Sequence, residues 1–250
     1  MGYYNTANGV YSLFNNTTGE TNTANGVLSL YSNTTGSSNT TNGAYSLYSN
    51  TTGTGNTAVG YNADVSTGNL TNATAIGYNA KVNASNKVRI GNTNVTVIEG
   101  QVAYSFPSDA RFKYHIQPNV PGLAFIMKLQ PVTYYFDEEK LEAFAKTGEL
   151  MDRNVHAVAF KGERELHTGF LAQDVEKIAN EMGYHFDGIR VPQNERGHYS
   201  LAYSQFIMPL VKAVQELQEI IKDQSEKNSK QQQIIEQLQK EVEQLKEKIK

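Results

Sequence analysis

Short apolar clusters separated by Asn-, Thr- and Gly-rich turns recur along the first hundred residues with a period of 17. One unit, "NTANGVLSLYSNTTGSS", begins at Asn22, and related units begin at Asn5, Asn39 and Asn56. β-Branched and aromatic residues between Asn/Gly turns indicate short strands. Because one unit buries too little apolar surface to offset the entropy of ordering it, the units must stack. We therefore predict an all-β solenoid over residues 1–100.

A disordered, low-complexity linker is the alternative for this region, which is rich in Asn and Thr and almost uncharged. A fixed period with apolar residues in register favours the solenoid. The final unit, "NKVRIGNTNVTVIEG", departs from the repeat, as a terminal unit commonly does. The Asn-x-Thr triplets match the glycosylation acceptor pattern, and we interpret them as by-products of the repeat.

A second period begins near Ser204, where seam positions alternate in steps of three and four. This heptad pattern predicts an α-helical coiled coil over residues 206–250. Ile and Val at a with Leu at d favour a dimer by themselves, whereas the repeat region argues for three chains. Glu241 and Lys246 stand at g and e positions, where they can pair between helices. The alternative to a coiled coil is a long, solvated single helix. The seam is Ile207, Leu210, Val214, Leu217, Ile221, Gln224, Asn228, Gln231, Ile235, Leu238, Val242, Leu245 and Ile249, whose three consecutive polar layers fix register.

The stretch between these two periods has mixed patterns typical of a small α+β domain, which we place at residues 101–205. Of the 22 Lys and Arg and 25 Asp and Glu residues, only six lie in the first hundred, so a composition border falls near residues 100–108. The expected elements are a helix over 119–129 with Asn119 as its N-cap, a strand over 130–137, a β-hairpin over 156–170 around Gly162, and a helix over 172–183.

Composition excludes several classes of function. A net charge of -3 gives no electrostatic basis for nucleic acid as a partner. There are no cysteines, and the five histidines form no i, i+3 or i, i+4 pair, so we expect no metal site and no cofactor. No apolar run is long enough to cross a bilayer, so we expect no membrane insertion. The N-terminus lacks the pattern of a secretory signal and begins inside a repeat, which suggests a C-terminal part of a longer chain.

Two repeat units, "TAVGYNA" (57–63) and "TAIGYNA" (74–80), carry a resemblance. They are similar to the head repeats of trimeric autotransporter adhesins and to the fibre repeats of phage tail proteins. This resemblance implies that the solenoid is a trimeric β-roll.

Four blocks of the second half carry a more specific resemblance. They resemble, in order, the motif blocks of the peptidase S74 intramolecular chaperone auto-processing domain, found in phage tail spikes, endosialidases and myelin regulatory factor. The resemblance implies a domain that guides trimerisation of the preceding fibre and then cuts itself off. The family's catalytic serine and the lysine five residues later fall on Ser108 and Lys113. The blocks are "SDARFKYHI" (108–116), "LQPVTYYF" (129–136), "HTGFLAQDVEKI" (167–178) and "YSLAYSQFIMPLVKAVQEL" (199–217).

The implied chemistry suits these two residue types. A serine hydroxyl becomes a good nucleophile when a base takes its proton, and lysine is such a base only when neutral. Burial against apolar groups favours neutral lysine, so packing into a trimer would couple assembly to cleavage. An i, i+5 spacing brings Ser108 and Lys113 together only through a bend or between two chains. We expect the cut at Pro107–Ser108 rather than Ser108–Asp109.

Other positions of the four blocks are candidates for supporting roles. Asp109 and Arg111 match the family pattern and are expected to orient the loop or cap an element. His167 falls where the family usually carries a histidine, and the alternative is a hairpin histidine with a backbone partner. His115 departs from the family's usual Asn.

An insertion before the third block leaves two candidates for the supporting histidine. The segment "EEKLEAFAKTGELMDRN" (138–154) lengthens a loop before the third block. His156, which follows it, competes with His167 for the supporting role.

The leading hypothesis is a trimeric fibre protein with a self-cleaving assembly chaperone, an autoproteolytic serine peptidase with no external substrate. The alternative is a bacterial surface adhesin or structural stalk in which the S74-like region only trimerises. A membrane-tethered transcription factor would need a DNA-binding domain and a transmembrane helix, which this sequence lacks. The expected location is a virion tail fibre or a bacterial surface, and a host-surface glycan or receptor fits the Asn, Thr and Tyr faces of the repeats.

Overall fold

A computed structural model describes residues 2–147 and 165–249, and these divide into two compact units. The first contains the repeats, and the second contains Ser108, Lys113 and the long C-terminal helix. Each unit draws on several stretches of the chain. Within the described residues, the first comprises 2–106, 135–147, 165–167 and 191–198, and the second comprises 107–134, 168–190 and 199–249.

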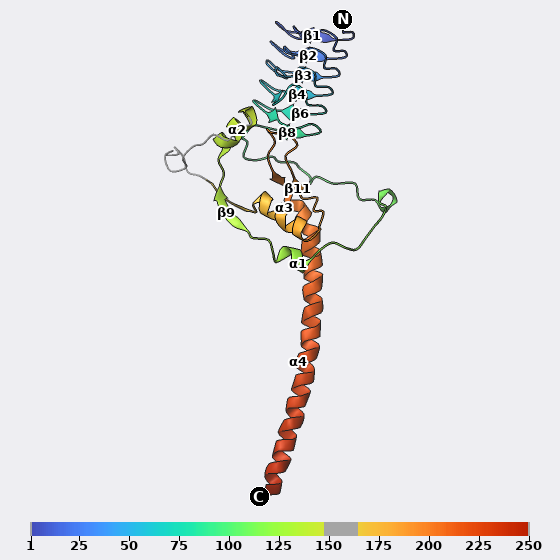
Figure 1. Cartoon of the computed structure of the whole chain (residues 1–250), viewed down its shortest axis with the longest axis vertical. Coiled ribbons are helices and arrows are strands. Elements are labelled where there is room, and N and C mark those ends of the chain that lie inside the picture. Colours follow the sequence, from blue (N-terminus) through green and yellow to red (C-terminus); the bar gives the residue numbers. More distant parts are fainter. Residues whose placement is uncertain (1, 148–164, 250) are drawn as a thin grey trace. The chain divides into compact units, whose positions relative to one another are not determined.

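The repeats form the predicted β-solenoid, in which short strands of successive turns stack in parallel (Figure 1). Equivalent residues pair at a step of 17, as in Thr23 with Thr40, until the last step, where Thr74 pairs with Val88. The main sheet contains β1 (Thr6–Asn8), β2 (Thr23–Asn25), β3 (Thr40–Asn42), β4 (Thr57–Val59), β6 (Thr74–Ile76) and β8 (Val88–Ile90); a second sheet pairs β5 (Asp64–Val65) with β7 (Lys81–Val82).

Buried asparagines explain why the repeat contains so many of them. Asn39 is fully buried, and its side-chain NH2 donates to Asn22 Oδ1 at 3.0 Å and to the Gly53 carbonyl at 2.9 Å. Its Oδ1 accepts the Asn56 backbone N–H at 2.9 Å. Such ladders satisfy polar groups inside the stack. Asn33, of an Asn-x-Thr triplet, is also fully buried, which agrees with our interpretation of these triplets as products of the repeat.

Close stacking dictates the backbone of each turn. Gly26 has φ +134, and a Cβ there would lie 2.4 Å from the Gly43 carbonyl oxygen of the next turn, so only glycine fits. Leu30 is fully buried with φ +51, a left-handed conformation that is uncommon for leucine. The equivalent residues of the neighbouring turns, Leu13 and Leu47, have the same left-handed conformation, and their side chains also lie in the solenoid core.

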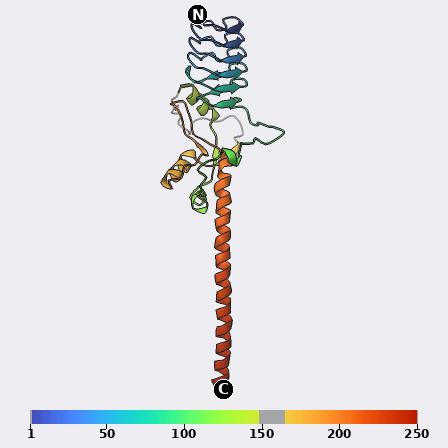
Figure 2. The same cartoon turned by 90° about the vertical axis from the view of Figure 1, so that its right-hand side faces the viewer.

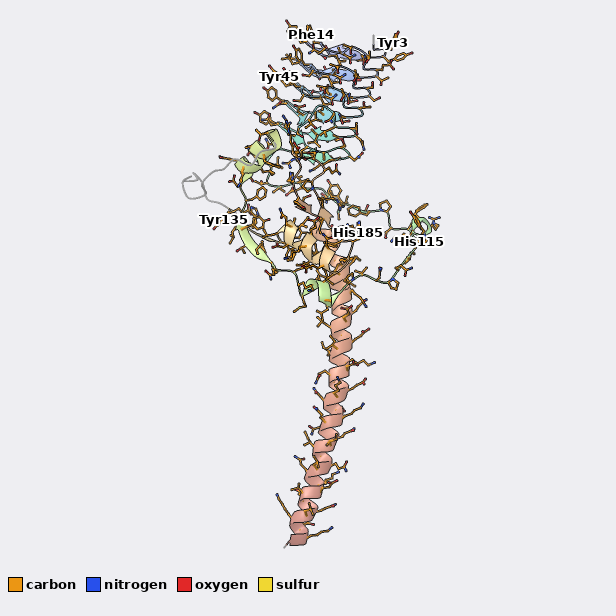
Figure 3. All side chains as sticks on the ribbon, viewed as in Figure 1. Tyr3, Phe14, Tyr45, His115, Tyr135 and His185 are labelled. Carbon is orange, nitrogen blue, oxygen red and sulfur yellow. The ribbon has the colours of Figure 1, made fainter. Side chains whose placement is uncertain are left out.

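Aromatic rings stack on the outside of the solenoid at the same 17-residue step. The ring of Tyr31 lies 5.7 Å from Phe14 and 5.4 Å from Tyr48, with nearly parallel planes. Phe14 and Tyr45 project from the same edge of the turns (Figure 3). Stacking of this kind adds to the stability of neighbouring turns.

The second unit is built around an aromatic core. Phe125 is fully buried, and Phe186 lies 5.3 Å from it and 4.7 Å from Phe206, measured between ring centroids. The described elements of this region are η1 (Ala110–Phe112), α1 (Leu123–Ile126), β9 (Val132–Tyr135), β10 (Leu166–Gly169), α3 (Ala172–Glu181), β11 (Ile189–Arg190), β12 (Ser200–Leu201), η2 (Tyr203–Phe206) and α4 (Ile207–Ile249).

The helix expected over 119–129 is shorter than predicted. α1 spans four residues, and Gly122 precedes it without a side-chain cap, so Asn119 as N-cap was wrong. The Leu123 N–H instead donates to Glu216 Oε2 of α4 at 2.7 Å. A carboxylate from a distant helix thus takes the role expected of a local residue.

Two further elements predicted for this region are present, and a third lies mostly outside the described residues. The strand over 130–137 is confirmed as β9, and the helix over 172–183 as α3, which is followed by Gly183 with φ +62. Most of the hairpin around Gly162 lies outside the described residues, and its final part, β10, pairs with β9.

The segment after residue 137 was expected to be a loop, but it contains a helix, α2 (Glu138–Thr147). Asp137 Oδ1 accepts the Lys140 N–H at 2.8 Å, and two glutamates occupy the first turn. Acidic residues in the first turn of a helix stabilise it, so these residues were a signal from which α2 could have been predicted.

α4 is a continuous helix of 43 residues (Figures 1 and 2). The large apolar side chains of its predicted seam are exposed in the single chain, including Leu217, Leu238 and Val242. In the parts of the chain that the structure describes, no helix is both long and apolar enough to span a bilayer.

Candidate functional site

Ser108 and Lys113 flank a single turn of 3-10 helix, η1. Asp109 precedes the turn as its N-cap, and Asp109 Oδ1 accepts the Arg111 backbone N–H at 2.9 Å. Lys113 follows the turn in an extended conformation, and its N–H donates to the Ala110 carbonyl at 3.1 Å. A capped three-residue turn therefore separates Ser108 from Lys113.

The turn brings the two candidate catalytic side chains into contact within one chain. Lys113 Nζ donates to Ser108 Oγ at 2.7 Å. The compact rise of a 3-10 turn provides the bend that an i, i+5 pair requires. A lysine from a second chain is not needed to bring an amine within hydrogen-bond reach of the serine.

An ion pair fixes the residues between them. The Arg111 guanidinium donates through Nε to Asp109 Oδ1 at 3.1 Å and through Nη2 to Oδ2 at 2.6 Å, a bidentate arrangement. The hydrogen bonds from Arg111 lower the pKa of Asp109 from its ordinary value, so this carboxylate stays charged. The guanidinium also lies 5.8 Å from the centroid of the Phe112 ring. Asp109 thus caps the turn, and the Arg111 side chain pairs with the capping carboxylate.

The site is open to solvent in the single chain. Ser108 and Lys113 are both exposed. Large apolar side chains around them are exposed as well, with Phe106 at 74%, Phe112 at 78% and Tyr114 at 85%. Rings of this size are rarely so exposed together unless a partner covers them.

The three histidines considered from the sequence have different surroundings. His167 lies half-buried on β10, and its supporting role stays a prediction. His156 lies outside the described residues. His115 has φ +53 and is exposed, with its ring 5.6 Å from Tyr114 (Figure 3).

One set of contacts in the first unit was not anticipated from the sequence. Residues 191–198 belong to the same compact unit as the solenoid, and Asn194, Arg196 and His198 contact its last turns. The segment carries no periodic or motif signal, so only the fold reveals these contacts.

Comparison with known families gives one match. Residues 108–184 match the family model Peptidase_S74, described as the chaperone of endosialidase. No curated protein and no solved structure matches the chain. The matched range begins at Ser108 and includes Lys113.

Proposed function

From the premise that residues 108–184 form a peptidase S74 domain, we propose that this chain is a trimeric fibre protein with a self-cleaving chaperone. In this proposal the C-terminal domain drives trimer assembly of the β-solenoid and then cuts itself off beside Ser108. The observation that carries the proposal is the 2.7 Å hydrogen bond between Lys113 Nζ and Ser108 Oγ.

The proposed reaction uses both side chains and one water. Ser108 Oγ attacks the carbonyl carbon of Pro107 while its proton passes to the neutral amine of Lys113. Collapse of the tetrahedral intermediate breaks the Pro107–Ser108 amide bond, and Lys113 returns the proton to the departing nitrogen. Water then hydrolyses the resulting ester, which leaves a carboxylate on Pro107 and a free amino group on Ser108.

Assembly would supply the environment that this chemistry requires. Lysine serves as a base only in its neutral form, which burial against apolar groups favours. Copies of Phe106, Phe112 and Tyr114 from neighbouring chains are suited to cover the dyad, because these rings are exposed in the single chain. The exposed seam of α4 is suited to a coiled coil, and the repeat region argues for three chains in it.

A denaturing gel with intact-mass measurement tests the proposal. The purified chain should convert into fragments of about 11 and 16 kDa, because a cut after Pro107 divides 27.7 kDa unequally. The N-terminal residue of the larger fragment should be Ser108. A chain that trimerises and stays at full length would instead support the adhesin or stalk alternative.

Disruption of the α4 seam should slow cleavage. Leu238→Asp places a charge in the apolar seam, so we expect monomers and a cleavage rate lower by about tenfold or more. Light scattering after size exclusion measures the assembly, and a gel time course measures cleavage.

Gln233→Asp is the matched control, because position 233 lies outside the seam. This variant should trimerise and cleave like the wild-type chain. Rapid cleavage by monomeric Leu238→Asp would contradict the coupling of assembly to cleavage.

A further inference from the structure

Residues 193–198 bind the last turns of the solenoid through both side chains and backbone. Asn194 Nδ2 donates to the Asn83 carbonyl at 2.8 Å, and Asn83 Nδ2 donates to the Arg196 carbonyl at 2.9 Å. The Arg196 guanidinium donates to the Ser66 carbonyl. Asn83 is only 3% exposed, so this contact is largely shielded from water.

The contacted residues lie at the ends of paired strands. Ser66 directly follows β5, and Asn83 directly follows β7. β7 is the last strand of this small sheet within the described residues. Terminal turns of a solenoid need a cap, and residues 193–198 supply hydrogen-bond partners at this end.

The orientation of the Asn83 amide favours the neutral form of His198. Lys87 Nζ donates to Asn83 Oδ1 at 3.0 Å, which turns the NH2 group of Asn83 toward residues 193–198. One of its hydrogens goes to the Arg196 carbonyl, and the other faces His198 Nδ1 at 3.2 Å. His198 Nδ1 must therefore accept a hydrogen bond, which only the neutral ring can do with its proton on Nε2.

The charges around His198 also oppose its protonation. Burial lowers the pKa of His198 below 6.5, and Lys87 and Arg89 lower it further. Lys81 and Arg89 line the same cavity of about 360 Å³ as His198. The buried acid in this region, Asp64, lies 3.6 Å from Lys81 rather than beside the imidazole.

We propose that residues 193–198 are a docking segment that keeps the C-terminal domain bound to the last solenoid turns after the backbone is cut, and that protonation of His198 releases it. This inference rests on the proposed cleavage beside Ser108. Residues 193–198 lie outside the range 108–184 that matches the family. Release of the mature fibre then requires two events, a cut and an undocking.

The direction of the pH dependence follows from the lowered pKa. A folded-state pKa below 6.5 means that the undocked histidine binds a proton more readily than the docked one. Docking is therefore at full strength above about pH 6.5 and weakens as the pH falls from there to the folded-state pKa.

The test makes the cut independently of Ser108. In the Ser108→Ala chain, residues 101–106, which are all exposed, are replaced by the recognition sequence of an added protease. After cutting at pH 7.5, the two fragments should co-elute on size exclusion. At pH 5.5 their dissociation constant should rise several-fold, up to about tenfold, which is the most that one histidine with a free pKa near 6.5 can contribute.

Three variants of the same chain locate the effect. Asn194→Ala with Arg196→Ala should separate the fragments at both pH values, and hydrogen exchange around Asn83 should accelerate. His198→Asn keeps a neutral acceptor near the position of Nδ1, so its fragments should stay together at pH 5.5. Fragments that stay together in the Asn194→Ala, Arg196→Ala chain would overturn the docking segment.

Wild-type fragments that bind equally at both pH values, or His198→Asn fragments that separate in acid, would overturn the histidine switch. Failure of the proposed self-cleavage shows separately, as an uncut chain with Ser108 intact and no protease added.

Discussion

Ser108→Ala should keep the chain at its full 27.7 kDa, whereas the wild-type chain divides into fragments of about 11 and 16 kDa. The substitution removes the nucleophile that attacks the Pro107 carbonyl and leaves both groups that form the turn, Asp109 and the backbone of residues 110–112, in place. We expect the cleavage rate to fall by about a thousandfold or more. Intact-mass spectrometry over several days measures the residual rate.

Lys113 should be equally necessary, and two substitutions separate its roles. Lys113→Ala removes both the base and the 2.7 Å hydrogen bond to Ser108 Oγ. Lys113→Arg keeps a hydrogen-bond donor but stays protonated, so it cannot take the serine proton. Both variants should remain uncut, and cleavage by Lys113→Arg at the wild-type rate would contradict a base role for Lys113.

Arg111→Ala is the matched control for changes in this turn. It removes the exposed ion pair with Asp109 but neither reacting group, and Asp109 still caps the turn through the backbone N–H of residue 111, so its chain should still cleave. Each uncut variant must also assemble like the wild-type chain by light scattering. An uncut variant that stays monomeric would report on assembly rather than on catalysis.

Asn39→Ala should destabilise the solenoid by about 3 kcal/mol per chain. The substitution leaves the Asn56 backbone N–H without its buried acceptor, removes the bond to Asn22 Oδ1 and creates a cavity. Because each turn contacts only its neighbours, the loss weakens the stack on both sides. Guanidinium unfolding followed by circular dichroism, in the Ser108→Ala chain, measures the change in midpoint.

Asn25→Ala, in the preceding repeat unit, is the control. Asn25 is exposed, and its NH2 lies 3.5 Å from Asn42 Oδ1, at the long limit for a hydrogen bond. We expect a change within about 0.5 kcal/mol. Equal destabilisation by the two substitutions would show that the buried ladder has no special contribution.

Elements with a repeated local pattern were predictable from the sequence. The 17-residue step predicted the stacked short strands, the heptad pattern predicted α4, and the helix expected over 172–183 before Gly183 is α3. α2 was missed, although Asp137 and the acidic first turn after it gave a usable signal. The resemblance to the peptidase S74 family singled out Ser108 and Lys113, because their spacing is too common to be informative.

Contacts between distant residues were beyond any local pattern. Glu216 binds the Leu123 N–H across 93 positions, which is why Asn119 was wrongly expected to cap α1. Asn83 is 115 positions from His198, and neither residue type distinguishes a docking contact from an ordinary surface. Leu30 adopts its left-handed conformation with its side chain buried in the core.

The sequence by itself therefore determined the repeat, the heptad seam and the two residues proposed for catalysis, because periodicity and motif order are properties of the chain alone. Only the tertiary structure decided that Lys113 reaches Ser108 within one chain, since this depends on the 3-10 turn that Asp109 caps. It also decided where residues 193–198 bind. Hydrogen-bond partners far apart in sequence are selected by the folded backbone, and no local preference encodes them.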